Sequence, residues 1–420
     1  MIVLPEGQVA ERAASLAAEW TARGLVAGDP VAVREGNTLE FVAARDAATA
    51  LGLWFVPINP RLAPPEVAHI LRTVAGCRLP VAGCRSPVSS SPAGATILFT
   101  SGTTGLPKAC LRPESAEAAR LTEMTATYGL SADDVHLIAC PLAHSAPGAL
   151  LRAARLAGAQ SVLMPRFDAA AFVDAVAATR ATLCFLVPTQ VGRLLAHGGD
   201  LSPLRAVIVA GAPFAPSLRA AFVDKLGPGK LWEFYGSSET GTISVAPPSA
   251  QPASGGFVGW PPPGVDVEIV DAKDGVGEIH VRSASLMSGY LGEPPVAPGA
   301  FVTAGDLGRR TADGGLELVD RRGDLILTGG VNVYPAEVER ALLEHPGVRG
   351  AVVFGRPHPD WGEEVCALIV ADVPEAELRD FLRARIAGYK IPKHFAFVGI
   401  DELPLGSSGK PLRRRARELF

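Results

Sequence analysis

Residues 100–108 read Thr-Ser-Gly-Thr-Thr-Gly-Leu-Pro-Lys and follow directly on the apolar run at 97–99. Glycines let a backbone approach an anion closely, hydroxyl and free N–H groups donate hydrogen bonds to its oxygens, and lysine adds a compact positive charge. The spacing differs from the Walker A pattern, since Pro107 precedes Lys108 and Ala109 follows it. A Ser/Thr/Gly-rich surface turn has the same composition. The loop alone therefore indicates a phosphate-binding site without excluding a plain turn.

Four further motifs follow this loop in a fixed order. They are Tyr-Gly-Ser-Ser-Glu-Thr-Gly at 235–241, Thr-Ala-Gly-Asp at 303–306, Asp-Arg-Arg-Gly-Asp at 320–324 leading to Gly-Gly-Val-Asn-Val-Tyr-Pro at 329–335, and Gly-Lys at 409–410. Together with the first loop they resemble the adenylate-forming superfamily, which includes acyl-CoA synthetases, the adenylation domains of peptide synthetases, and luciferases. The resemblance covers residues 99–414, and five ordered motifs rarely agree by chance.

The resemblance implies an enzyme that uses ATP to activate a carboxylic acid, with Mg²⁺ and CoA as further ligands. Bringing two anions together and expelling pyrophosphate requires positive charge and hydrogen-bond donors around the phosphates. By the matched motifs, Lys108 and the loop before it bind the β- and γ-phosphates, and Glu239 holds Mg²⁺, which prefers carboxylate and phosphate oxygens. The loop residues are Thr100, Ser101, Gly102, Thr103, Thr104 and Gly105.

The same resemblance implies a nucleotide pocket. Tyr235 is expected to stack near the adenine, with Gly236 and Ser238 in the same site, although an aromatic ring is more often a core residue. Asp306 is expected to accept hydrogen bonds from both ribose hydroxyls, because an ionised carboxylate accepts two donors at once. Arg321 is expected to support the same sugar from the other side.

Lys410 lies in a glycine-flanked loop near the C-terminus and matches the family lysine that bridges the carboxylate and the α-phosphate during adenylation. Read alone, it is a solvated charge. Gly323 stands where family members usually carry an Asp or Lys hinge for the C-terminal domain, and glycine tolerates large backbone changes. Gly329 and Gly330 are expected to let pantetheine pass close to the backbone. The basic cluster at 413–417 reads as a solvated helix face.

His144 is the candidate for the acyl pocket, because Pro-Leu-Ala-His at 141–144 resembles the family's Pro-Leu-aromatic-His segment. A lone histidine is nevertheless more often a structural residue. Gly211 and Ala212 are expected to line the same cavity, where small residues leave room for an apolar tail or ring. Neither segment contains an Asp or Arg to pair with a second charged group. The pattern therefore predicts an uncharged fatty or aromatic acid as substrate.

The composition is that of a globular protein. The chain has 420 residues, of which 48% are hydrophobic and 20% charged, and its net charge is −4. This length predicts two or three domains, and the charge gives no general reason to expect nucleic acid as a partner. The six cysteines lack metal-ligand spacing, and no apolar run approaches the roughly 20 residues that cross a bilayer. These features fit a soluble cytoplasmic enzyme with reduced thiols, and assembly as a homodimer stays open.

The N-terminal region shows helical spacing of apolar residues at 8–24 and 39–53, followed by a proline-marked helix ending near Val74. A short buried strand is expected at 31–33 and an extended segment at 54–58. In the family, a further stretch of strand and helix separates such a region from the phosphate loop. That stretch is missing here, so we expect a shortened N-terminal domain.

Farther along, short Val/Ile/Leu-rich strands at 161–164, 183–187 and 206–210 alternate with Ala-rich helices such as 169–179. This alternation indicates layered α/β structure with mostly parallel strands. The segments at 265–281 favour a small antiparallel subdomain.

Beyond Asp324 a small, mobile α+β domain is expected, with a helix over Pro335–Leu343 that begins at its proline. We therefore predict an N-terminal AMP-binding domain at 1–322 and a C-terminal lid domain at 323–420.

The leading hypothesis is an acid–thiol ligase that makes an acyl-adenylate and then an acyl-CoA. The alternative is a stand-alone adenylation enzyme that loads a carrier protein or another nucleophile. A non-catalytic nucleotide-binding module is disfavoured, because all the charged residues expected for catalysis are present. These are Lys108, Glu239, Asp306, Arg321 and Lys410.

Overall fold

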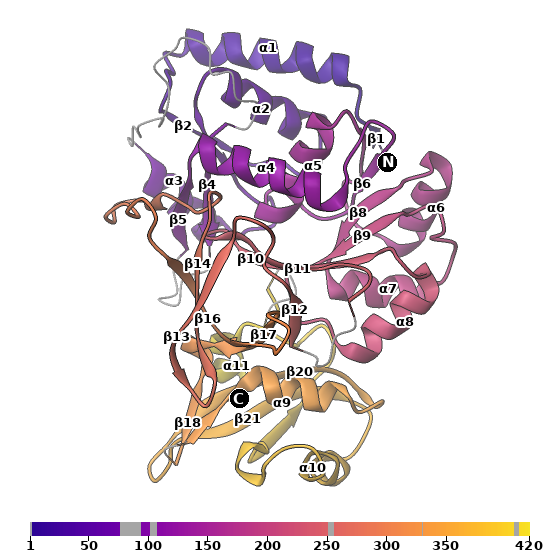
Figure 1. Cartoon of the computed structure of the whole chain (residues 1–420), viewed down its shortest axis with the longest axis vertical. Helices are drawn as coiled ribbons and strands as arrows, with labels where there is room; N and C mark the ends of the chain where they lie inside the picture. Colours follow the sequence, from indigo (N-terminus) through magenta and orange to yellow (C-terminus); the bar gives the residue numbers. More distant parts are fainter. Residues whose placement is uncertain (1, 76–93, 101–106, 251–255, 330, 407–410) are drawn as a thin grey trace.

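The computed structural model describes residues 2–75, 94–100, 107–250, 256–329, 331–406 and 411–420. Three sheets with their covering helices form the first three quarters of the chain, and a fourth sheet lies at the end of the molecule opposite the N-terminal helices (Figure 1). The mixed α/β class predicted from the sequence is confirmed.

The largest sheet has seven strands in the order β1-β7-β6-β8-β9-β10-β11. Its five inner strands are parallel, while β1 and β11 pair antiparallel at the edges. The strands are β1 Ile2–Val3, β6 Val135–Ile138, β7 Gln160–Leu163, β8 Leu183–Leu186, β9 Ala206–Val209, β10 Leu231–Ser237 and β11 Gly241–Ala246.

Helices cover both faces of this sheet. In β8, Leu183 and Phe185 pack with α4 and α5, whereas Cys184 and Leu186 pack with α6, α7 and α8. Burial on both faces explains why these strands read as continuous apolar runs. The helices are α4 Glu114–Tyr128, α5 Ser145–Leu156, α6 Ala169–Thr179, α7 Pro188–His197 and α8 Pro216–Leu226.

A five-stranded sheet in the order β15-β5-β4-β3-β2 carries the strands on either side of the phosphate loop. Among the described strands β2 pairs only with β3, and its residues are half-buried or exposed. The strand predicted at 31–33 is present, but its predicted burial was wrong, because this strand lies at the sheet edge. The elements are α1 Glu6–Ala22, β2 Pro30–Val33, α2 Leu39–Ala50, β3 Trp54–Pro57, α3 Pro64–Val74, β4 Thr96–Thr100, β5 Lys108–Arg112 and β15 Gly289–Tyr290.

The third sheet is antiparallel throughout, in the order β12-β17-β16-β14-β13, and it contains the segment expected to form an antiparallel subdomain. Its strands are β12 Phe257–Gly259, β13 Asp266–Lys273, β14 Val276–Arg282, β16 Val302–Arg310 and β17 Leu316–Arg321.

The fourth sheet, in the order β19-β18-β21-β20 with β22 beside β21, packs against α9 and α11. The predicted helix over Pro335–Leu343 is α9. The elements are η1 Arg322–Asp324, β18 Ile326–Thr328, β19 Val331–Val333, α9 Pro335–Leu343, β20 Val348–His358, β21 Gly362–Ala371, α10 Glu375–Arg383, η2 Gly388–Lys390, β22 His394–Phe397 and α11 Arg413–Leu419.

The basic cluster at 413–417 is not a uniformly solvated face. The Arg413 side chain is 9% exposed, and its guanidinium bonds both carboxylate oxygens of Glu339 at 2.9 and 3.0 Å and Asp324 at 3.0 Å. Arg414 is solvated, with 79% of its side chain exposed. The prediction was thus wrong for Arg413, whose partners lie far away in the sequence.

Candidate active site

Three segments with predicted site residues lie toward the carboxyl ends of the parallel strands β6, β9 and β10 of the seven-stranded sheet. His144 comes after β6, Gly211 and Ala212 come after β9, and β10 carries Tyr235. The carboxyl ends of parallel strands meet at one edge of a sheet, where ligands of open α/β folds bind. The topology therefore brings these segments to one edge.

The turn between β10 and β11 is shaped by close backbone approach. The pairing register shifts after Tyr235, and a Cβ on Gly236 would lie 2.1 Å from the carbonyl oxygen of Gly241. A side chain at Gly236 is therefore not tolerated without moving the backbone. The Ser237 hydroxyl accepts the N–H of Glu239 at 3.2 Å, which fixes the turn that presents the Glu239 carboxylate.

Tyr235, Asp306 and Arg321 form a clasp. The Tyr235 hydroxyl donates to Asp306 Oδ2 at 2.7 Å, and Arg321 Nε donates to Oδ1 at 3.2 Å. Asp306 and Arg321 face each other across β16 and β17, so the pair follows from strand register. Burial, and then the Asp306 carboxylate, raise the pKa of Tyr235 well above its ordinary value, which keeps the phenol protonated as a donor.

The carboxylate of Asp306 keeps acceptor capacity beyond these two bonds, since an ionised carboxyl group has about four lone-pair sites. The Tyr235 ring packs in a hydrophobic cluster with Ile243, Val281 and Leu316. The expected stacking of this ring on adenine stays a prediction.

Lys108 and Glu239 are linked through Tyr290. The Lys108 ammonium lies 4.9 Å from the Tyr290 ring centroid and 2.8 Å from Glu293 Oε1. The Tyr290 hydroxyl donates to Glu239 Oε1 at 3.0 Å. Burial, followed by the Glu239 carboxylate, raises the pKa of Tyr290. Lys108, a cation suited to phosphates, and Glu239, a carboxylate suited to a hard cation, thus both contact Tyr290.

The phosphate loop connects two strands of a hairpin, because Thr100 in β4 pairs with Lys108 in β5. Lys108 begins a strand and not a helix, which agrees with rejecting the Walker A pattern. Several predicted site residues lie outside the described part of the chain: Ser101, Gly102, Thr103, Thr104, Gly105, Gly330 and Lys410.

A cluster of buried charged side chains packs against the turn that carries Glu239. Arg112 is fully buried, and its guanidinium donates to the carbonyl oxygens of Ser238 at 2.7 Å and Ser285 at 3.0 Å. Glu117 bridges Arg112 and Arg152. Burial acts to raise the pKa of Glu117, but the surrounding guanidiniums, led by Arg152 and Arg112, outweigh it and hold the pKa far below its ordinary value.

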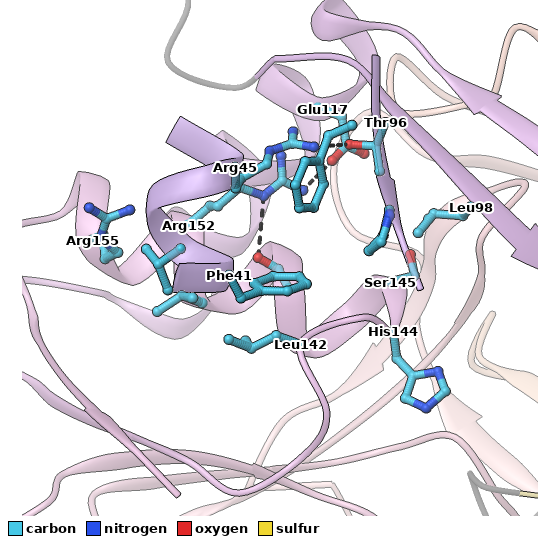
Figure 2. Close-up of a pocket in the computed structure, with 15 residues that line it drawn as sticks. Phe41, Arg45, Thr96, Leu98, Glu117, Leu142, His144, Ser145, Arg152 and Arg155 are labelled. Atoms are coloured by element: carbon cyan, nitrogen blue, oxygen red, sulfur yellow. Dashed lines mark hydrogen bonds and ion pairs between the residues drawn. The ribbon is translucent and has the colours of Figure 1, made fainter. Parts of the chain in front are cut away.

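Figure 2 shows a cavity bounded by α2, β3, β4 and α5, with Arg45 and Glu117 at one end and the His144 imidazole directed away from them. Its volume of about 30 Å³ accommodates a few water molecules. The His144 ring nitrogen Nε2 instead lies 3.4 Å from Asn59 Nδ2. The acyl-pocket roles of His144, Gly211 and Ala212 stay predictions.

The structure adds residues near the site that sequence reasoning did not assign to it. Tyr290 contacts Glu239 and Glu293 contacts Lys108. Arg112 anchors the turn, and Asn59 contacts His144.

Gly329 has φ +57° and donates its N–H to the Trp361 carbonyl at 2.9 Å.

Comparison with known proteins assigns the family. Residues 7–82 and 83–291 match the AMP-binding enzyme family, and residues 337–410 match the AMP-binding enzyme C-terminal domain. A feruloyl-CoA synthase from Amycolatopsis sp. is 32% identical over 466 aligned positions, which cover 99% of this chain and 94% of the relative. The chain therefore belongs to the AMP-binding enzyme family, and its resemblance to the adenylate-forming superfamily is confirmed.

Solved structures show the same architecture. An amide bond synthetase from Marinactinospora thermotolerans matches with a TM-score of 0.88 and 30% identity, over 99% of this chain and 94% of that chain. An o-succinylbenzoate CoA synthetase from Bacillus subtilis, in complex with an acyl-adenylate intermediate, matches with a TM-score of 0.86 and 27% identity over 99% and 93% of the two chains.

Within the described residues, no helix is both long and apolar enough to span a membrane.

Proposed function

We propose that the protein is an AMP-forming acid–thiol ligase, which converts a carboxylate and ATP to an acyl-adenylate and pyrophosphate and then transfers the acyl group to the thiol of CoA. The observation that carries this proposal is similarity along nearly the whole chain to a feruloyl-CoA synthase. The clasp around Asp306 supports it, because an acidic acceptor with a neighbouring guanidinium suits a ribose diol.

The residues present fit ATP and Mg²⁺. Asp306 and Arg321 would hold the ribose with Tyr235 near the base, and Lys108 with the loop hydroxyls would contact the phosphates. Among the described residues no group of three His, Cys, Asp or Glu could hold a metal by itself. Mg²⁺ usually binds one or two carboxylates together with substrate phosphates, so Glu239 alone is adequate. When bound, Mg²⁺ would neutralise phosphate charge.

The acid is proposed to be an uncharged aromatic or fatty acid. The segments containing His144, Gly211 and Ala212 offer no ionised partner for a second carboxylate, and the relatives include a feruloyl-CoA synthase. A stand-alone enzyme that transfers the acyl group to a carrier protein or another nucleophile is the second candidate. It is favoured by the structural similarity to an amide bond synthetase.

Carboxylate-dependent ATP–pyrophosphate exchange over a panel of aromatic and fatty acids tests the proposal, followed by addition of CoA to the best acid. Acid-dependent exchange together with acyl-CoA formation is expected. Exchange without CoA consumption would favour the second candidate, and the absence of exchange with every acid would contradict both.

Asp306→Asn is expected to raise the KM for ATP by about 10- to 100-fold, because hydrogen bonds to a charged acceptor contribute about 1.5–3 kcal/mol. The exchange assay at varied ATP measures this change. Asp266→Asn is a matched control, since Asp266 is a 60% exposed carboxylate on β13 of the same sheet, paired with Arg282. An unchanged KM in Asp306→Asn would remove Asp306 from the ribose site.

We further propose that residues 1–322 and 323–420 are the two domains, joined by a hinge at Gly323. In support, β17 of the third sheet ends at Arg321, η1 spans Arg322–Asp324, and β18 of the fourth sheet begins at Ile326. The alignment of 466 positions exceeds the 420 residues of this chain, so this chain is shorter than its relative within the aligned region. In the thioester-forming arrangement, Gly329 and Gly330 would lie beside pantetheine.

Gly323→Pro is expected to preserve ATP–pyrophosphate exchange and to reduce acyl-CoA formation about tenfold or more, because proline fixes φ and would restrict the rotation. Gly323→Ala is the control and should retain most of both activities. Comparing the two half-reactions measures the effect. Normal overall turnover in the proline variant would argue against a hinge at this position.

A further inference from the structure

The ammonium of Lys108 already has an anionic partner inside the protein. It lies 2.8 Å from Glu293 Oε1, and both side chains are accessible, at 41% and 48% exposure. The partner is a single carboxylate oxygen, an anionic acceptor as a phosphate oxygen is. Because both groups are solvated, exchanging one anion for the other involves little desolvation.

Backbone pairing holds Glu293 in this place. Tyr290 of β15 pairs with Cys110 of β5, and the Leu291 N–H donates to the Ala109 carbonyl at 2.9 Å. The Glu293 N–H then donates to the Tyr290 carbonyl at 3.1 Å, which closes a turn. The pairing of β15 with β5 thus places the turn that carries Glu293 beside the strand that carries Lys108.

Tyr290 connects this ion pair to Glu239. Its ring faces the Lys108 ammonium at 4.9 Å, and its hydroxyl donates to Glu239 Oε1 at 3.0 Å. The Glu239 residue is 7% exposed, and a buried carboxylate is held in one rotamer by such a donor. Lys108 and Glu239 therefore share Tyr290 as a neighbour.

We propose that Glu293 and Tyr290 are positioning residues for adenylation. Glu293 pairs with Lys108 until the triphosphate of ATP replaces the Glu293 carboxylate. Tyr290 orients the Glu239 carboxylate toward the position of the metal. The inference rests on the proposed function. Glu293 acts against nucleotide binding both by occupying Lys108 and by repelling phosphate charge, so both effects of its removal have the same sign.

Glu293→Gln should lower the dissociation constant of Mg-ATP, measured by calorimetry without any acid, by about two- to fivefold, which corresponds to an exposed ion pair. Glu375→Gln is the matched control, because Glu375 is 43% exposed and paired with Arg379 in α10. It should leave the constant unchanged. Unchanged or weaker ATP binding in Glu293→Gln would overturn the role of Glu293.

Tyr290→Phe retains the ring beside Lys108 and removes only the hydroxyl. We expect the Mg²⁺ concentration for half-maximal exchange to rise at least threefold, with partial rescue by excess Mg²⁺ and an unchanged KM for the acid. A merely structural role would lower the unfolding temperature without moving the Mg²⁺ dependence, and that result would overturn the role of Tyr290.

The outcomes separate this inference from the proposed function. Normal acid-dependent exchange in the wild type, with unaltered ATP binding in Glu293→Gln, would reject only the positioning role of Glu293. Tighter ATP binding in Glu293→Gln, with no exchange for any acid in the wild type, would reject only the proposed ligase activity. A wild-type protein that does not bind ATP would reject both.

Discussion

Lys410→Ala is expected to slow acyl-adenylate formation by about 10²- to 10³-fold, the usual effect of removing one group that stabilises transition-state charge. In the matched family motif this lysine places its ammonium between the attacking carboxylate and the α-phosphate, where negative charge grows. Thioester formation from preformed acyl-adenylate should be nearly unchanged, because that step does not need this ammonium.

The structure frames the loop that carries Lys410. Leu405 forms an isolated bridge with Pro411, and the Leu412 N–H donates to the Pro404 carbonyl at 2.8 Å, so both ends of the loop are fixed to each other. ATP–pyrophosphate exchange measures the first half-reaction, and synthetic acyl-adenylate mixed with CoA measures the second. Lys410→Arg is the control that preserves charge and should retain part of the first activity. Equal losses in both half-reactions would refute this division.

Glu117→Gln is expected to lower the free energy of unfolding by about 3–5 kcal/mol, because it leaves buried guanidiniums without their compensating carboxylate. Glu117 is 1% exposed and bridges Arg112, which is fully buried, and Arg152. Urea unfolding measures the loss. Glu375→Gln breaks an exposed pair and should cost less than about 1 kcal/mol. A similarly small loss in Glu117→Gln would mean that the guanidiniums are compensated elsewhere.

The same carboxylate predicts a pH dependence. The pKa of Glu117 is lowered in the folded protein, so its contribution to stability is fully present above the ordinary glutamate pKa of about 4.3 and is lost as pH falls below that value toward the folded pKa. The wild type should therefore lose stability steeply below about pH 4. The stability of Glu117→Gln should fall less steeply in that range.

Local signals predicted many elements of the fold. Prolines at the first helical turn marked α3 and α9, and α6 matches its expected range of 169–179, with the Asp168 side chain accepting the Ala171 N–H as N-cap. The parallel strands were visible as apolar runs because both of their faces are buried. These features depend on neighbours in sequence and are therefore readable without the structure.

Contacts between distant residues were not readable. Tyr290 and Glu239 are 51 positions apart, and Arg413 and Glu339 are 74 apart. Strand register and helix docking bring these side chains together, and neither leaves a local pattern. The expectation that β2 is buried failed for the same reason, because its edge position depends on which strands pair with it. The motifs nevertheless identified Asp306, Arg321 and Tyr235, which the fold joins directly.

The most direct test of the account is a crystal structure of the protein with AMP and the preferred acid. We predict AMP at the carboxyl edge of the seven-stranded sheet, with both ribose hydroxyls within hydrogen-bond distance of Asp306 and the phosphate beside Glu239. AMP bound elsewhere, or a ribose that does not contact Asp306, would contradict the account.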